Sequence, residues 1–118
     1  MVSGPQQGRL LYMLVRLARA SRVLEVGCFS GYAALWMALG LPPGGHLLSL
    51  ERDERAAEVA HQQLQASGVA SQVELRLGDA MASLHALPDA TPPFDLIFLD
   101  ADKKCALAAR VSERAHII

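Results

Sequence analysis

Residues 23–32 read VLEVGCFSGY, and the architecture of the chain follows from this segment. A short apolar run that carries one carboxylate, Glu25, stops at Gly27, and a new apolar pattern begins after Gly31. The pattern predicts a strand, a tight turn and a helix start, the local form of a nucleotide-binding crevice in an α/β sheet. Glycines suit this turn because the backbone must bend sharply and approach a ligand at the helix N-terminus.

The composition is that of one globular α/β domain. The chain has 118 residues, of which 52% are hydrophobic and 19% charged, and this length allows one buried core. The net charge of -1 gives no basic footprint for nucleic acid, and no apolar run is long enough to span a membrane. Cys28 and Cys105 have no metal-ligand spacing, so we interpret them as free thiols of a cytoplasmic protein.

The N-terminal segment leaves one minor alternative for the localisation. It contains four arginines and no acid before residue 23, as a mitochondrial transit peptide would. The same segment carries an apolar stripe, which predicts an ordinary amphipathic helix over residues 6–20 that leads into the first strand. We therefore expect the cytoplasm and keep mitochondrial import as the alternative.

Strands and helices alternate along the rest of the chain. The apolar pattern predicts strands at 23–26, 46–51, 73–77 and 94–100 and helices at 32–39, 54–66 and 80–87. This alternation predicts a Rossmann-like, doubly wound parallel sheet with helices on both faces. We expect a single, partial domain over residues 1–118, with no clear strand in 110–118.

Two helices carry further local predictions. Asp53 is the expected N-cap of the helix at 54–66, whose inner face would consist of Ala56, Val59, Ala60 and Leu64. Trp36 and Met37 follow helical spacing in the helix at 32–39, so we expect core packing there and not a substrate box. The four histidines fall on no ligand spacing and are expected at the surface.

Acidic side chains come at the ends of the predicted strands. Glu51, Asp79 and Asp100 each stand at a carboxyl end, outside the core, and Glu25 stands just inside the first strand. In an open α/β sheet this edge is where ligands bind. One such carboxylate is as often a solvated loop residue, but four beside a glycine turn predict a binding site.

Two classes of nucleotide compete for this edge. A dinucleotide needs glycine two positions after Gly27, where this chain has Phe29, and its pyrophosphate would face carboxylates at close range. A positively charged nucleoside without phosphates fits both observations, and S-adenosylmethionine is such a ligand. Its ribose hydroxyls suit Glu51, and its carboxylate suits the helix N-terminus at 31–32. A NAD-dependent oxidoreductase is the less favoured alternative.

Three motifs carry a resemblance to a known family. They are LEVGCFSGY at 24–32, GDA at 78–80 and FDLIFLDADK at 94–103. The segment GPQQG at 4–8, which precedes them, is part of the same likeness. Together they resemble the cation-dependent class I O-methyltransferases, the group of catechol and caffeoyl-CoA methyltransferases. The likeness runs from Ser3 to Lys103 and stops after the Asp-Ala-Asp-Lys element.

The resemblance implies an S-adenosylmethionine-dependent O-methyltransferase that acts on a small hydroxylated aromatic acceptor, with a homodimer left open. It assigns cofactor contacts to the rim residue Asp79 and to Ser3, Glu25, Gly27, Cys28, Ala33, Glu51, Ala80 and Asp100. It also implies that Asp100 binds a divalent cation such as Mg²⁺, which acts as a Lewis acid on the acceptor oxygens. Lys103 would be the general base, with Asp102 in the same loop.

Some positions depart from the family pattern. Ala33 replaces a serine that would contact the methionine carboxylate, and Lys104-Cys105-Ala106 replaces the usual continuation after Lys103. The family's further metal ligands, an Asp-Asn pair, belong to a strand beyond Ile118, and Asp100 alone does not satisfy a hard cation. A catalytically inactive fragment or relative that acts as a binding module is therefore the main alternative.

Overall fold

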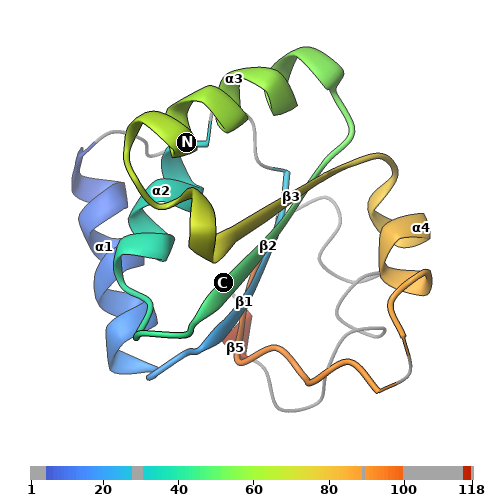
Figure 1. Ribbon diagram of the computed structural model, residues 1–118. Helices are drawn as coiled ribbons and strands as arrows, with labels where there is room; N and C mark the ends of the chain where they lie inside the picture. Colours follow the sequence, from blue (N-terminus) through green and yellow to red (C-terminus); the bar gives the residue numbers. More distant parts are fainter. Residues whose placement is uncertain (1–4, 28–30, 89, 100–115, 118) are drawn as a thin grey trace.

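The computed structural model describes residues 5–27, 31–88, 90–99 and 116–117, and Figure 1 shows their arrangement. The elements in chain order are α1 (Pro5–Leu17), β1 (Arg22–Val26), α2 (Tyr32–Leu39), β2 (His46–Glu51), α3 (Glu54–Ala66), the 3-10 turn η1 (Ala70–Gln72), β3 (Val73–Leu77), α4 (Ala80–His85), β4 (Leu96–Leu99) and β5 (His116–Ile117). The predicted alternation of strands and helices is confirmed.

The strands form one parallel sheet in the order β3-β2-β1-β4-β5. Helices α1, α2 and α3 pack on one face and α4 packs on the other (Figure 1). The predicted α/β class, a Rossmann-like doubly wound parallel sheet, is confirmed. The chain crosses from β3 to the other side of β1 to form β4, so the topological switch point lies at the carboxyl ends of β1 and β4.

Three predicted boundaries shift by a few residues. α1 ends at Leu17, not at residue 20, because Arg19 adopts a φ of 51° and the N–H of Ala20 turns back to the carbonyl of Val15 at 3.1 Å. A left-handed residue at this place ends a helix. α4 stops at His85 and β4 begins at Leu96, so both elements are shorter than predicted.

The strand β5 corrects the expectation that residues 110–118 hold no strand. Its two residues pair in parallel with Leu96 and Ile97 of β4. Two residues are too few to leave a periodic pattern in the sequence, so only the pairing reveals this strand.

The buried face of α3 differs from the predicted one. The buried residues are Ala57, Ala60 and Leu64, whereas Val59 is 42% exposed and Ala56 is only half-buried. The prediction favoured the larger side chain, but close approach to α2 selects the small ones. A Cβ at Gly31 would lie 3.0 Å from the Cα of Ala60.

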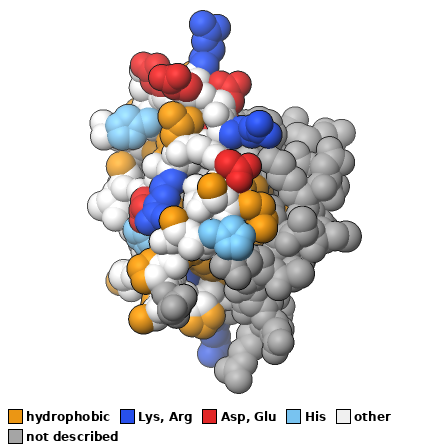
Figure 2. All heavy atoms as spheres, turned by 90° about the vertical axis from the view of Figure 1, so that its right-hand side faces the viewer, with side chains coloured by type: hydrophobic (Ala, Val, Ile, Leu, Met, Phe, Trp, Pro, Cys, Tyr) orange, Lys and Arg blue, Asp and Glu red, His pale blue; other side chains and the backbone are white. Residues whose placement is uncertain are grey.

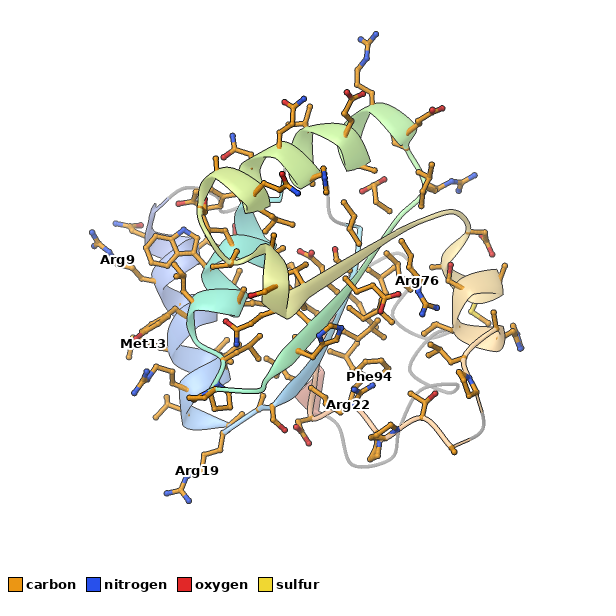
Figure 3. The ribbon with its side chains drawn as sticks, in the orientation of Figure 1. Arg9, Met13, Arg19, Arg22, Arg76 and Phe94 are labelled. Atoms are coloured by element: carbon orange, nitrogen blue, oxygen red, sulfur yellow. The ribbon has the colours of Figure 1, made fainter. Side chains whose placement is uncertain are left out.

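α1 packs tightly against α2 through glycines. A Cβ at Gly8 would overlap the indole of Trp36, and a Cβ at Gly40 would lie 2.9 Å from the carbonyl oxygen of Tyr12. Met37 is fully buried and Trp36 packs against the same core, so the predicted core role of both residues is confirmed. The opposite side of α1 is apolar and exposed, and Figure 3 shows Met13 on it, pointing away from the sheet.

At the amino-terminal edge of the sheet, Asp95 joins the segment before β4 to the start of β1. Its carboxylate accepts hydrogen bonds from the N–H groups of Ser21 and Arg22 at 2.9 and 3.0 Å and from the Ser21 hydroxyl at 3.1 Å. Burial alone would raise the pKa of Asp95, but these hydrogen bonds and the Arg22 charge outweigh it and hold that pKa below its usual value. The Arg22 guanidinium also lies over the ring of Phe94, 5.1 Å from its centroid (Figure 3).

The face that carries α4 shows acidic and basic side chains interspersed among apolar ones (Figure 2). His61 and His85 are exposed, as predicted. His46 is half-buried, with its Nε2 3.8 Å from the carboxylate of Glu74. Among the described residues, no helix has the length and apolar character needed to cross a membrane.

Candidate functional site

The carboxyl ends of the parallel strands meet at one edge of the sheet, called here the carboxyl edge. Two glycine turns at this edge are held by main-chain hydrogen bonds to β2. The N–H of Gly27, with a φ of 90°, donates to the carbonyl of Leu50 at 2.8 Å, and the N–H of Gly78, with a φ of 137°, donates to the carbonyl of Glu51 at 2.9 Å. These positive φ values explain glycine at both positions.

Glu25 lies within the covered face of the sheet and not at a solvated rim. Its side chain is fully buried, and its Oε1 accepts a hydrogen bond from the Ser49 hydroxyl at 2.7 Å. The two residues are in register on β1 and β2. Because side chains alternate along a strand, Glu25 shares with Val23 the face that α1, α2 and α3 cover.

Glu51 ends β2 on the same face, two residues after Ser49. Its side chain is 5% exposed, and its Oε2 accepts a hydrogen bond from the N–H of Asp53 at 2.9 Å. Asp53 caps α3 through hydrogen bonds from the N–H groups of Arg55 and Ala56. The predicted N-cap is confirmed. The expectation that Glu51 stands outside the core is wrong, because its carboxylate is buried and supports the turn into α3.

Asp79 and Ala80 follow β3 but lead toward the opposite face. The exposed Asp79 caps α4, since its Oδ2 accepts a hydrogen bond from the N–H of Ala82 at 3.0 Å. Ala80 is buried in the core cluster between the sheet and α4. Of the predicted acidic edge, the structure therefore brings Glu25 and Glu51 onto one face, while Asp79 serves as a helix cap.

α2 begins at the switch point with a glycine in place of an acidic cap. Gly31 has a φ of 85° and offers no side chain to the first-turn amides, whereas Asp53 and Asp79 supply carboxylates to α3 and α4. Amides at a helix N-terminus attract the anionic group of a ligand. Ala33, in the first turn of α2, packs against the core and has no hydroxyl to add.

The remaining predicted site residues lie outside the described part of the chain; they are Ser3, Cys28, Asp100, Asp102 and Lys103. Within residues 5–27, 31–88, 90–99 and 116–117, no group of three or more His, Cys, Asp or Glu side chains could hold a metal ion. The cation site at Asp100 and the base at Lys103 stay predictions.

Sequence reasoning missed Ser49, which the structure places beside Glu25. A signal for it exists, because β2 reads HLLSLE and a serine inside an apolar strand stands on the same face as Glu51. The partner on β1 could be identified only from the register of the two strands, which depends on tertiary structure.

The arrangement suits a ligand with two kinds of polar group. Buried carboxylates at Glu25 and Glu51 accept hydrogen bonds and favour positive charge. The first turn of α2 presents amide donors and favours negative charge. A zwitterionic ligand with hydroxyl groups matches both.

The comparisons with known proteins agree on one family. A family profile described as O-methyltransferase matches residues 1–109. The catechol O-methyltransferase of Mycobacterium tuberculosis is 44% identical over 118 residues, covering 96% of this chain and 53% of that protein. The caffeoyl-CoA O-methyltransferase of Populus kitakamiensis is 38% identical over 99 residues, covering 82% of this chain and 42% of that protein.

The similarity extends to solved structures. The O-methyltransferase TomG of Streptomyces achromogenes, involved in tomaymycin synthesis and solved in complex with SAM, matches with a TM-score of 0.89 and 36% identity. The match covers 98% of this chain and 53% of that one. The chain spans about half the length of the relatives that it matches.

Proposed function

Because the chain belongs to the O-methyltransferase family, we propose that residues 1–118 form the cofactor-binding domain of an S-adenosylmethionine-dependent O-methyltransferase. The observation that carries the proposal is the pair of buried carboxylates, Glu25 and Glu51, on one face of β1 and β2 beside the Gly27 turn. The acceptor is a small hydroxylated aromatic of the catechol or caffeoyl type, the class in the names of the relatives. Two cysteines without a metal-ligand or C-x-x-C spacing suit a cytoplasmic location.

The described residues fit the polarity of this cofactor. Its ribose supplies hydroxyl donors, which Glu51 at the end of β2 can accept. Its methionine carboxylate suits the amide donors at the start of α2, where Gly31 adds no competing acid. Glu25 adds a second acceptor on the same face, near the Gly27 turn.

We assign the remaining roles from the family resemblance. Ser3, Cys28, Ala33, Asp79 and Ala80 line the cofactor, and Asp79 also keeps its role as the cap of α4. The cofactor supplies a methyl group activated by a sulfonium. Asp100 would contribute one ligand to a divalent cation, which would supply Lewis-acid chemistry, and Lys103 would accept the proton of the reacting hydroxyl.

Calorimetric titration with S-adenosylhomocysteine, the demethylated product, tests the proposal without turnover. We expect wild type to bind it and not to bind NAD. Glu51→Gln should weaken binding at least tenfold, because a charge-assisted hydrogen bond is worth about 1.5–3 kcal/mol. Glutamine keeps the length of the side chain and one acceptor oxygen for the N–H of Asp53, so the turn into α3 stays supported.

Glu58→Gln is the matched control, because Glu58 is an exposed glutamate of α3, whereas Glu51 is buried at the end of β2. Its affinity should equal that of wild type. If wild type bound NAD and not S-adenosylhomocysteine in these titrations, the proposal would be overturned. Equal affinities of Glu51→Gln and wild type would refute the ribose assignment.

A further inference from the structure

Ser49 makes a buried polar contact that the proposed cofactor roles leave unexplained. Its hydroxyl donates to Oε1 of Glu25 at 2.7 Å, and both side chains are 0% exposed. Ser49 is in register with Glu25 on β1. The contact therefore joins two neighbouring strands on the face that leads to the Gly27 turn.

The pair lies in a row of side chains that crosses the sheet. Phe98 of β4 is in register with Glu25, and Leu75 of β3 is in register with Ser49. Both apolar residues pack against the core cluster of α1, α2 and α3. Apolar neighbours on both sides exclude water, and a hydrogen bond in such surroundings restrains a carboxylate more strongly than it would in water.

We infer that Ser49 is a positioning residue that holds the Glu25 carboxylate in the orientation used for cofactor binding. The inference rests on the proposed function. Ser49 itself acts through Glu25. Its hydroxyl donates to Oε1 of the carboxylate and thereby restrains the side-chain torsions of Glu25.

Stability alone does not explain the pair. Replacement of both partners of a buried polar pair by apolar groups is often neutral or stabilising, whereas removal of one partner is costly. A core position between Phe98 and Leu75 would be filled more favourably by two apolar residues. The polar pair is therefore better explained by the position of Glu25, two residues before Gly27, than by the packing of the sheet.

A double-mutant cycle in S-adenosylhomocysteine affinity tests the inference. The variants are Ser49→Ala, Glu25→Met and the double substitution, all titrated well below their unfolding midpoints. Alanine removes the hydroxyl with little loss of volume, and methionine keeps the length of glutamate without its charge. We expect Ser49→Ala to weaken binding about tenfold, which corresponds to about 1.4 kcal/mol, and to have no further effect in the Glu25→Met background.

Ser49→Thr is the conservative control, because threonine keeps the hydroxyl and suits a strand. It should recover most of the affinity lost in Ser49→Ala. A purely structural role would lower the unfolding midpoint of Ser49→Ala and leave its affinity at the wild-type value, which would overturn the inference. Equal effects of Ser49→Ala in the wild-type and Glu25→Met backgrounds would also overturn it. Absence of binding by wild type would instead refute the proposed function.

Discussion

Substitution of Gly31 by alanine should destabilise the fold by about 3 kcal/mol. Gly31 has a φ of 85°, and a Cβ there would lie 3.0 Å from the Cα and 3.1 Å from the Cβ of Ala60 in α3. The left-handed conformation costs an alanine about 1–2 kcal/mol, and overpacking costs about 1–3 kcal/mol. Alanine also makes the unfolded chain less flexible than glycine does, and this effect restores about 0.4–1 kcal/mol of stability.

Gly44→Ala is the matched control, since Gly44 has a φ of 81° and nothing within 4 Å of the added Cβ. Gly44→Ala has the conformational cost without the overpacking, so we expect it to lower the free energy of unfolding by about 1 kcal/mol. For a domain of this size, each kcal/mol shifts the unfolding midpoint by about 4 °C. Circular dichroism melts should therefore place Gly31→Ala about 12 °C below wild type and Gly44→Ala about 4 °C below.

Equal losses in the two variants would refute the close packing of Gly31 against α3. Position 31 would then need glycine only for its backbone conformation. The predicted difference matters for the site, because a shift of α2 away from α3 moves the N-terminus of α2. Gly31→Ala should accordingly weaken S-adenosylhomocysteine binding at temperatures where it remains folded, whereas Gly44→Ala should bind normally.

Two further substitutions test the edges of the fold. Asp95→Asn should lower stability by about 1 kcal/mol at pH 6, and its difference from wild type should become smaller at pH 3. Because folding lowers the pKa of Asp95, its carboxylate stabilises the fold above the unfolded-state pKa of about 3.9, and this stabilisation is lost as the pH falls through the folded-state pKa. Urea midpoints of variant and wild type that differ equally at both pH values would contradict this. Gly8→Ala should destabilise despite a gain of about 1 kcal/mol in helix propensity, because the methyl group overlaps the indole of Trp36. A higher melting temperature for Gly8→Ala would contradict it, and Gly8→Ala combined with Trp36→Leu should recover stability.

The order of helices α1 to α4 and strands β1 to β4 could be predicted because each of them has a strong local signal. Gly27 and Gly31 punctuate the first strand and helix, and Asp53 marks the start of α3. The inner face of α3 could not be predicted in the same way. Hydrophobicity favoured Val59 over the alanines, but the distance between α2 and α3 is set by Gly31, and only small residues such as Ala60 fit there.

The surroundings of the candidate site residues could be predicted only in part. The sequence places Glu25 and Glu51 near strand ends, which suggested a solvated rim. Both are buried in the structure, because a parallel sheet is covered on both faces. The contact of Ser49 could not be predicted, because its partner Glu25 is 24 positions away in the sequence and becomes a neighbour only through the register of β1 and β2.

The parallel topology also explains why acidic residues at opposite edges serve different purposes. At the amino-terminal edge, the Asp95 carboxylate accepts three hydrogen bonds from Ser21 and from Arg22, the first residue of β1, and so ties the start of β1 to the start of β4. At the carboxyl edge, strands lead into helix N-termini, and Asp53 and Asp79 cap two of them. α2 begins with Gly31 instead, and it does so beside the face that holds Glu25 and Glu51. One edge therefore places amide donors beside carboxylate acceptors, a combination whose polarity matches a ligand with an anionic end and a cationic, hydroxyl-bearing body.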